Sequence, residues 1–369
     1  MQDKFLLRNK YIFVQFKVKK MKLLFFGLAV FFGQFLTAQT AAKKFISAAD
    51  AKFSYVGRFD FSNAKQPAFM YSGSAIKAVF SGTSVEMEMK DDNLRNYFTI
   101  IIDDSIFKLK TDKPAGIYML AKDLPNKKHT LQIIRRTEWH GGDSHFVGLY
   151  LDAAKRLFKP TINKRSIEFI GDSYTCGYGN EGASKNEHFS YETENSYLSY
   201  GAITARALQA DYIGICRSGI GMYQGYGGHP KFAMPAVYDE VINSNKLSWD
   251  FAAHQPSMVV IDLGSNDFSA VLDSVKFTTA YLDFLKRIRN NYPQSTIVCA
   301  AGPSGGGDSF DTQQSYIKAV VDAFGKDDKA VHYFVFSAFQ MNGSDWHPNV
   351  AEHKKMSAEL IPFLKSLLK

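Results

Sequence analysis

The stretch SIEFIGDSYTCGYG, residues Ser166–Gly179, decides the fold of the larger part of the chain. Its apolar beginning, Ser166–Ile170, predicts a short buried strand, and Gly171 permits a tight exit from that strand. Asp172 and Ser173 are both good helix N-caps, so a turn that starts a helix explains them without any chemistry. A serine at this place also presents its hydroxyl, and its own N–H, at the edge of the sheet.

Strands and helices alternate downstream of this stretch. The continuous apolar run Met258–Leu263 is suited to the middle of a parallel sheet. About five parallel strands with intervening helices predict a doubly wound, flavodoxin-like α/β domain over residues 164–369, with its site beyond the carboxyl ends of the strands. We expect further strands at 211–217, 295–301 and 331–336, and helices at 195–208, 274–291, 312–324 and 350–368.

The residues before the α/β domain follow a period of two. Val85–Met89 alternates apolar and polar residues, and similar short runs with turn signals between them extend from about Ala48 to Asp152. Evenly spaced strands of this kind predict an N-terminal β-sandwich, or jelly-roll-like, domain over residues 44–155. The basic stretch that follows, up to Arg165, is expected to be a linker.

The N-terminal segment combines a basic stretch with an apolar run, Leu23–Leu36, and small residues around Ala38. This order is typical of a secretory signal peptide, expected over residues 1–39, and an N-terminal membrane anchor is the alternative. Met21 is a natural start for such a peptide, which makes residues 1–20 an over-extended start. Cleavage would leave a secreted, periplasmic or cell-surface protein without stable membrane insertion.

The charge and the cysteines exclude some classes of function. The net charge is +8, but seven basic residues and one acidic residue lie within residues 1–22. The rest of the chain is nearly balanced, so we expect no nucleic-acid partner. The spacing of Cys176, Cys216 and Cys299 suggests no zinc site. We expect three small buried apolar residues, with a Cys176–Cys216 disulfide as the alternative.

Two further motifs follow predicted strands and could complete a site with Ser173. The sequence RSGIG at residues 217–221 can direct a backbone N–H at an oxyanion, although alone it indicates a glycine turn. In GSND, residues 264–267, the side-chain amide of Asn266 can donate to the same place. The N–H of Ser173, the N–H of Gly219 and this amide would form an oxyanion hole. Asp172 and Asp267 are expected to hold loops by hydrogen bonds.

A histidine in the last loop can serve as the base for Ser173. The sequence SDWHPN, residues 344–349, places His347 just before the C-terminal helix, with an acid beside it. A nucleophilic serine needs such a base, and the base needs an orienting partner. The other eight histidines are explained more simply as surface, loop or packing residues.

These blocks, in this order, resemble the SGNH/GDSL hydrolases, and more closely carbohydrate esterase family 2. The resemblance rests on GDSYTCGYGNEG, YETENSYLSYGAITARALQADY, SGIGMY, LGSNDFS and SDWHPN, together with IIRRTEWHGG and FVGLYLD in the β-domain. It implies a serine esterase that removes O-acetyl groups from plant polysaccharides such as xylan or glucomannan. It also implies that Ser173 is the nucleophile and His347 the base, with Gly219, Asn266 and the Ser173 N–H as the oxyanion hole and no metal or cofactor.

The third catalytic member is left open by the sequence. In the wider superfamily the acid lies three residues before the histidine, but here Ser344 occupies that position and Asp345 lies two residues before. Some members of the esterase family orient the histidine with a backbone carbonyl at that place. Asp345 is therefore expected to act either through its carboxylate or through its main-chain oxygen.

Aromatic residues are the candidates for substrate binding. Trp346 can form an apolar platform for a pyranose ring, with a core wedge as the alternative. Tyr178 and Tyr223 are weaker candidates for the cleft wall, and Trp139 of the β-domain is expected to pack between domains rather than to bind sugar. Two other functions stay open: an esterase, lipase or thioesterase for other acyl groups, and a carbohydrate-binding protein.

Overall fold

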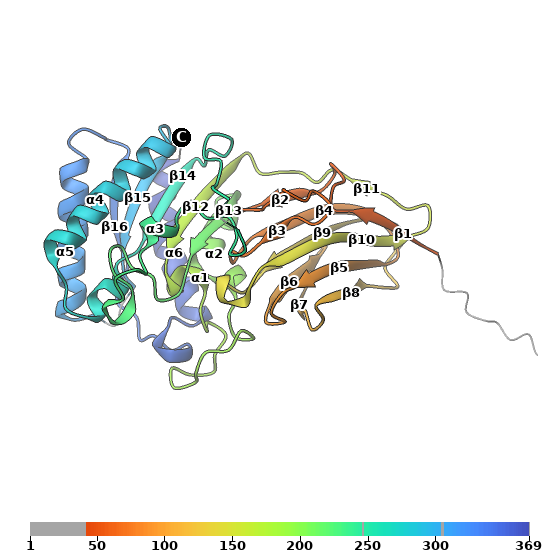
Figure 1. Cartoon of the computed structure of the whole chain (residues 1–369), viewed down its shortest axis with the longest axis horizontal. Helices are drawn as coiled ribbons and strands as arrows, with labels where there is room; N and C mark the ends of the chain where they lie inside the picture. Colours follow the sequence, from red (N-terminus) through yellow and green to blue (C-terminus); the bar gives the residue numbers. More distant parts are fainter. Residues whose placement is uncertain (1–41, 246, 304–305, 369) are drawn as a thin grey trace, which may run out of the picture. The chain divides into compact units, whose positions relative to one another are not determined.

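The computed structural model describes residues 42–245, 247–303 and 306–368, and every structural statement below concerns these ranges (Figure 1). The predicted signal peptide, residues 1–39, lies outside them. No helix within the described ranges has the length and hydropathy that crossing a bilayer requires.

The N-terminal half is a sandwich of two antiparallel sheets, as predicted (Figure 1). In β5 the side chains of Val85, Met87 and Met89 enter the core between the sheets, which explains the period of two. One sheet has the order β1-β10-β5-β8, with β3 beside β10: β1 (Lys43–Ser47), β10 (Ser144–Asp152), β5 (Val85–Asp91), β8 (Ala115–Ala121) and β3 (Ala68–Phe69). The other has the order β11-β4-β9-β6-β7, with β2 beside β4: β11 (Leu157–Phe158), β4 (Ala75–Gly82), β9 (Lys127–Arg135), β6 (Tyr97–Ile102), β7 (Ser105–Lys110) and β2 (Ser54–Val56).

Part of the stretch expected to be a linker belongs to the sandwich. Strand β11 pairs with β4, with Leu157 opposite Phe80, and the Leu157 side chain is buried in the sandwich core. The sandwich therefore continues past residue 155, because this short apolar pair covers the open edge of β4.

The C-terminal half contains one parallel sheet of five strands. Its order is β13-β12-β14-β15-β16. The strand of this sheet that comes first in the sequence, β12, therefore lies between the second and the third, β13 and β14, as in the predicted flavodoxin-like arrangement. The strands are β12 (Arg165–Gly171), β13 (Ala210–Cys216), β14 (Met258–Asp262), β15 (Thr296–Ala301) and β16 (Val331–Val335). The crevice where the winding reverses lies at the carboxyl end of β12, which is where Ser173 follows.

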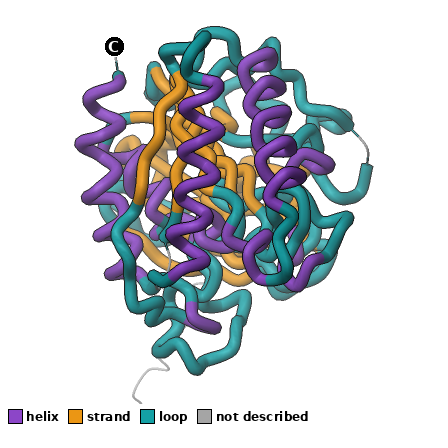
Figure 2. Tube along the Cα trace, turned by 90° about the vertical axis from the view of Figure 1, so that its left-hand side faces the viewer, coloured by secondary structure: helices purple, strands orange, loops and turns teal. Residues whose placement is uncertain are grey.

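Two helices cover each face of this sheet. Val259 and Ile261 of β14 pack with α4 (Ser274–Asn291) and α5 (Asp308–Phe324). The alternate residues of that strand pack with α2 (Tyr200–Ala207) and α6 (Val350–Leu367) on the other face. Figure 2 shows the long helices running alongside the strands. The short helices are α1 (Ser173–Cys176), α3 (Met234–Val237), η1 (Trp139–Gly141), η2 (Ser196–Leu198), η3 (Tyr226–Gly228), η4 (Ser265–Ser269) and η5 (Ser344–Trp346).

Two helices of the α/β domain start at other residues than predicted. The helix expected from residue 195 begins as the turn η2, and α2 starts only at Tyr200, after its N-cap Ser199. Helix α5 begins at Asp308, four residues before the predicted start. Helix α4 has the predicted bounds because the Asp273 carboxylate accepts hydrogen bonds from the first turn.

Buried charged side chains join the sandwich to the α/β domain. Arg58 of the sandwich is wholly buried, lies over the ring of Tyr238 at 5.0 Å, and forms an ion pair with Glu168 of β12 at 3.7 Å. Asp143 accepts hydrogen bonds from the N–H groups of Asn243 and Ser244, at 3.1 and 3.0 Å. Because an unpaired buried charge is costly, these pairs favour one arrangement of the two domains.

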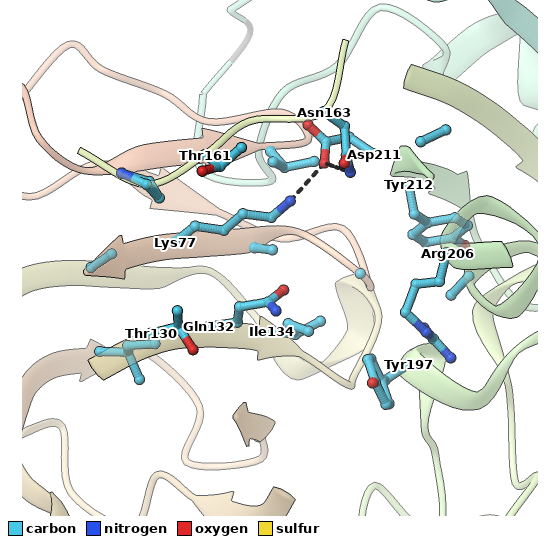
Figure 3. A pocket seen from close by; sticks show the side chains of 18 of the residues that line it. Lys77, Thr130, Gln132, Ile134, Thr161, Asn163, Tyr197, Arg206, Asp211 and Tyr212 are labelled. Atoms are coloured by element: carbon cyan, nitrogen blue, oxygen red, sulfur yellow. Dashed lines mark hydrogen bonds and ion pairs between the residues drawn. The ribbon is translucent and has the colours of Figure 1, made fainter. Parts of the chain in front are cut away.

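A cavity of about 490 Å³ also lies between the domains (Figure 3). The Lys77 ammonium lies 2.6 Å from the Asp211 carboxylate, which joins strand β4 to strand β13. At the other end of the cavity, the Arg206 guanidinium stacks over the Tyr197 ring at 3.8 Å. None of the residues that line this cavity is a predicted site residue.

Candidate active site

Ser173 and His347 lie within hydrogen-bonding distance. Ser173 is the first residue of α1, directly after β12, and its Oγ is 2.9 Å from Nε2 of His347. Gly171 is required for this tight exit, because a Cβ there would lie 2.1 Å from Oγ1 of Thr175 and 2.7 Å from the carbonyl oxygen of Asp262. The structure therefore brings together the two residues on which the sequence prediction depends.

The other ring nitrogen of His347 faces main-chain oxygens. Nδ1 lies 3.0 Å from the carbonyl oxygen of Asp345 and 3.1 Å from that of Ser344. With its proton on Nδ1, the neutral ring presents the lone pair of Nε2 to Ser173. Burial lowers the pKa of His347, and the two carbonyl contacts oppose that shift. The geometry thus favours a neutral histidine that can accept a proton.

The Asp345 carboxylate contacts a neighbouring loop instead of His347. It lies 2.9 Å from Nδ1 of His188 and accepts hydrogen bonds from the N–H of Phe189 at 2.8 Å and the hydroxyl of Tyr178 at 3.1 Å. Asp345 and Trp346 both have left-handed backbone conformations, with φ of 49° and 61°. Each costs of order 1–3 kcal/mol, and the turn that they form places the Asp345 carbonyl next to the imidazole.

The glycines of GYGNEG hold the histidine loop in place. The N–H of Ser344 donates to the carbonyl of Gly179 at 3.0 Å. A Cβ on Gly179 would lie 2.4 Å from Cβ of Ser344, and one on Gly182 would lie 2.1 Å from its Oγ. Larger residues would therefore displace the loop that carries His347. Packing against Ser344 therefore explains why two positions of the motif are glycines.

The three candidate oxyanion donors follow three neighbouring strands. Gly219 follows β13 with a φ of +81°, a conformation that favours glycine. Asn266 lies in η4 after β14, and its Nδ2 contacts the carbonyl oxygen of Ile220 at 2.9 Å and the carboxylate of Asp172 at 3.2 Å. In the described ranges, neither the Ser173 N–H nor the Gly219 N–H donates to a protein acceptor. Asn266 thus contacts a residue next to each of the other two candidates.

Asp172 and Asp267 hold loops, as predicted. Asp172 accepts hydrogen bonds from the N–H of Tyr174 at 3.1 Å and from the Ser265 hydroxyl, and Asp267 accepts from three successive N–H groups, residues 222–224. Burial raises the pKa of each carboxyl to about 6. These contacts fix the loops that carry the candidate oxyanion donors.

Aromatic rings surround His347. The Tyr178 ring lies 4.2 Å from the imidazole, measured between ring centroids, and stacks on Phe189. The ring of Tyr174, which the sequence did not single out, meets His347 edge-on at 5.4 Å. Tyr178 therefore packs on the candidate base, and its place in a cleft wall stays a prediction.

The other two substrate-binding candidates differ in their surroundings. Trp346 is 58% exposed beside the site, so it is not a core wedge, and the Lys185 ammonium lies 4.0 Å from the centre of its ring. Tyr223 packs against the core, and its hydroxyl accepts from the N–H of Asp273 at the start of α4. No hydrogen bond or ring contact in the described ranges links Tyr223 to Ser173 or His347, so its contacts support a packing role.

The cysteine prediction was wrong in its preferred form. Cys176 and Cys216 form a disulfide, with their Cα atoms 5.6 Å apart, and only Cys299 is free and buried. The physical reason is that β12 and β13 are parallel neighbours, with Gly171 opposite Cys216, so the last residue of β13 meets the short helix α1 that follows β12. The disulfide joins the end of α1 to the strand that leads to Gly219.

A buried glutamate of the sandwich was missed. Glu138 follows β9, has no exposed surface, and accepts a hydrogen bond from the N–H of Ser218 at 2.6 Å. Neither its spacing nor its neighbours in the sequence indicate such a contact, because the partner is 80 residues away.

As predicted, Trp139 packs between domains: the Arg217 guanidinium lies 4.9 Å from the centre of its ring. No group of three or more His, Cys, Asp or Glu side chains in the described ranges is arranged to hold a metal ion.

Two family models match successive parts of the chain. The model described as carbohydrate esterase 2 N-terminal matches residues 55–160, and that of the GDSL-like lipase/acylhydrolase family matches residues 169–355. These ranges coincide with the sandwich and with most of the α/β domain.

Relatives of known activity match across both domains. The chain is 38% identical over 320 residues to a cellulase/esterase, CelE, of Acetivibrio thermocellus; the match covers 85% of this chain and 39% of the relative, so the chain spans well under half of that protein. It is 29% identical to an acetylxylan esterase / glucomannan deacetylase of Cellvibrio japonicus, covering 82% of this chain and 88% of the relative.

Solved structures agree with these matches. A family two carbohydrate esterase from Clostridium thermocellum in complex with cellohexaose superposes with a TM-score of 0.82 at 37% identity, covering 85% of this chain and 98% of that one. A family two esterase from Cellvibrio japonicus superposes with a TM-score of 0.83 at 27% identity, covering 89% and 98%. The sandwich, the sheet order and these matches together show that the chain belongs to family 2 of the carbohydrate esterases, with a GDSL-like hydrolase domain.

Proposed function

We propose that the protein is a serine esterase that removes O-acetyl groups from the sugars of plant polysaccharides such as xylan or glucomannan. The observation that carries this proposal is the 2.9 Å contact between Oγ of Ser173 and Nε2 of His347. A serine hydroxyl becomes an effective nucleophile when a positioned base can take its proton as it attacks. The family of esterases to which the chain belongs supports the same chemistry.

The proposed reaction has two steps. His347 takes the proton of Ser173 while Oγ forms a bond to the acetyl carbonyl carbon. The tetrahedral intermediate then breaks its bond to the sugar oxygen, which leaves with the proton from His347 and yields the free sugar hydroxyl and an acetyl-enzyme. His347 next takes a proton from water, the hydroxide attacks the acetyl-enzyme, and Ser173 takes the proton from His347 as acetic acid leaves and ionises to acetate in water.

The negative oxygen of each intermediate would be stabilised by the three candidate donors. These are the N–H groups of Ser173 and Gly219 and the amide of Asn266, each at the end of a different strand. The fixed loops place these donors before the reaction begins, and one such donor contributes about 3–4 kcal/mol of transition-state stabilisation in a serine hydrolase.

We propose further that the base is oriented by the carbonyl of Asp345 and not by its carboxylate. The carbonyl oxygen lies 3.0 Å from Nδ1 of His347, whereas the carboxylate is occupied by His188, Phe189 and Tyr178. A neutral Nδ1–H needs an acceptor, but that acceptor need not carry a charge. The carboxylate then acts indirectly, by holding the turn that presents the carbonyl.

The sugar would rest on Trp346. Its exposed indole lies one residue before the base, and the apolar face of a pyranose ring suits an aromatic surface. The relatives that are acetylxylan esterases / glucomannan deacetylases support acetylated xylan or glucomannan as substrates. Because such polymers lie outside cells, we also propose that the protein is exported, as its N-terminal sequence predicts.

The test is acetate release from a panel of acetylated polysaccharides by the wild type and by Ser173→Ala. We expect release from acetylated xylan or glucomannan by the wild type only. A parallel series of aryl esters with lengthening acyl chains measures the acyl preference, and the acetate is expected to react fastest. Faster turnover of esters with long acyl chains would indicate that the natural substrate is an ester of another acyl group. Full activity of Ser173→Ala would contradict the mechanism.

A second candidate function is binding of unsubstituted glycan at the same site. The relative from Clostridium thermocellum was solved with cellohexaose, a sugar without acetyl groups, and the exposed Trp346 of this chain is an aromatic surface that suits a pyranose ring. Calorimetric titration of Ser173→Ala with cellohexaose tests it. Binding that Trp346→Ala abolishes would support this second function, and absence of heat in both would contradict it.

A further inference from the structure

A carboxylate of the sandwich domain reaches the loop that carries Gly219. Glu138 lies between β9 and η1, and its side chain has no exposed surface. One carboxylate oxygen accepts a hydrogen bond from the N–H of Ser218 at 2.6 Å, and the other accepts from the hydroxyl of the same serine. Both donors of Ser218 are therefore held by one side chain from another domain.

The α/β domain holds the rest of this loop by itself. The carbonyl of Gly219 accepts from the N–H of Tyr226 at 2.8 Å, and the carbonyl of Ile220 accepts from Nδ2 of Asn266 at 2.9 Å. On the side before Gly219, Arg217 is held within the α/β domain by Gly171 and Ile220, whereas Ser218 is held by Glu138. The peptide between Ser218 and Gly219 contains the N–H that faces the proposed oxyanion, so its orientation depends on how Ser218 is fixed.

The segment around Glu138 is built to keep this carboxylate in place. The Arg135 guanidinium donates to the carbonyl oxygens of Thr137, Glu138 and Gly142, at 2.8, 3.0 and 2.7 Å. The Trp139 ring packs under the Arg217 guanidinium, directly before Ser218. A buried carboxylate is costly unless hydrogen bonds satisfy it, so its use here indicates a need for that geometry.

We propose that Glu138 is a positioning residue for the esterase reaction: the sandwich domain fixes the oxyanion loop of the α/β domain through the Glu138–Ser218 contact. This rests on the proposed function, in which the Gly219 N–H is an oxyanion donor. The accessory domain is then a required part of the active site. A shift of about 1 Å in a group of this kind can cost about 100-fold in rate.

The charge of Glu138 has a second, separable effect. Burial lowers the pKa of His347, and the negative charge of Glu138 is among the groups that oppose this shift. His140 lies near Glu138, with its Nδ1 3.6 Å from the carboxylate. The charge of Glu138 also acts on Arg135, Asp172, Tyr178 and Glu194, and Arg136 lies beside Glu194. Burial and the charge of Glu138 raise the pKa of Glu194 well above its ordinary value, which favours a neutral Glu194.

Two substitutions separate the position of the carboxylate from its charge. Glu138→Asp keeps the charge but withdraws the acceptor by one methylene, so we expect kcat for an aryl acetate to fall about 10- to 100-fold while KM stays within about twofold. Glu138→Gln keeps the length and one acceptor oxygen, so we expect it to retain more of kcat. Because Glu138→Gln removes the charge, the acid limb of its pH profile should move to lower pH, whereas that of Glu138→Asp should not.

The matched control is Asp143→Asn. Asp143 is also a buried carboxylate of the sandwich that accepts two backbone hydrogen bonds across the domain boundary, but it holds residues 243–244 and not the oxyanion loop. We expect its kcat to stay close to that of the wild type, because residues 243–244 carry none of the proposed reacting groups. An equal loss in Asp143→Asn and Glu138→Asp would show that domain docking alone matters, and would overturn the proposal.

The remaining outcomes are also decisive. Unchanged kcat in a folded Glu138→Asp would overturn the positioning role. If thermal unfolding shows that Glu138→Asp does not fold, the substitution Ser218→Ala is tested instead, because it removes the hydroxyl partner of Glu138. We expect kcat of Ser218→Ala to be about 3- to 10-fold below that of the wild type. Unchanged kcat in this variant would overturn the positioning role of Glu138. A wild-type protein without Ser173-dependent hydrolysis would contradict the proposed function itself, whereas an active wild type with an unaffected Glu138→Asp contradicts the positioning role alone.

Discussion

The carbonyl oxygen of Asp345 lies 3.0 Å from Nδ1 of His347, while the carboxylate of the same residue points to His188, 2.9 Å away. One residue thus supplies a neutral acceptor to the candidate base and a charged anchor to a neighbouring loop. The left-handed backbone at Asp345 allows both contacts at once, because it turns the carbonyl toward the imidazole ring.

Asp345→Asn tests which oxygen orients the base. Asparagine tolerates the left-handed conformation and keeps the main-chain carbonyl, so we expect kcat to fall by less than about tenfold. In a triad that uses the carboxylate, the same type of change costs about 10⁴-fold. Steady-state kinetics on an aryl acetate decide between the two, and a loss near the larger figure would assign the role to the carboxylate.

The activity should persist at lower pH than an ordinary histidine allows. The reaction needs neutral His347, and burial lowers the pKa of this histidine from its ordinary value of 6.5. Activity therefore rises with pH through a midpoint below 6.5. A profile of log kcat/KM against pH measures the free-enzyme midpoint. A midpoint at or above 6.5 would show that neighbouring negative charges outweigh burial.

Asn266→Ala should impair the chemical step. Its amide is a proposed oxyanion donor, and removal of one such donor costs about 10²–10³-fold in kcat. The amide also contacts the Ile220 carbonyl, so thermal unfolding must accompany the kinetics. A stable variant with near-normal kcat would remove Asn266 from the oxyanion hole.

Trp346→Ala should separate polymer from small substrates. The indole is 58% exposed, so its loss should change the free energy of unfolding by less than about 0.5 kcal/mol. We expect KM for acetylated polysaccharide to rise several-fold while kinetics on an aryl acetate change little. Equal effects on both substrates would indicate that Trp346 supports the turn that holds His347.

The disulfide leads to two predictions, one for the number of free thiols and one for the free energy of unfolding. The denatured, non-reduced protein should contain one titratable thiol, Cys299, because Cys176 and Cys216 are paired. The pair closes a sequence separation of 40, so reduction should lower the free energy of unfolding by about 3–4 kcal/mol in the chain-entropy model. Three thiols in the oxidised protein would contradict the pairing.

The fold was largely predictable because each element carries its own local signal. The alternation in Val85–Met89 and the apolar run Met258–Leu263 determine the two sheet types, and Asp273 marks the start of α4. The linker was mispredicted because two apolar residues, Leu157 and Phe158, are too short a run to reveal a strand.

The candidate site was predictable where it depends on motifs at strand ends. Ser173, Asn266 and His347 each follow a strand or precede a helix with recognisable neighbours. Glu138 and the Cys176–Cys216 disulfide depend on contacts between distant segments, which no local pattern encodes. The choice between the two oxygens of Asp345 depends on its backbone angles, which the sequence specifies only through the packing of the whole loop.

Trapping the acetyl-enzyme tests the proposed role of Ser173 as nucleophile. The protein is mixed with an aryl acetate and quenched in acid within one turnover, and its peptides are analysed by mass spectrometry. We expect one added acetyl group on Ser173 in the wild type and none in Ser173→Ala, with kcat of that variant reduced by about 10⁶-fold. An acetyl group on another residue, or undiminished turnover by Ser173→Ala, would contradict this role.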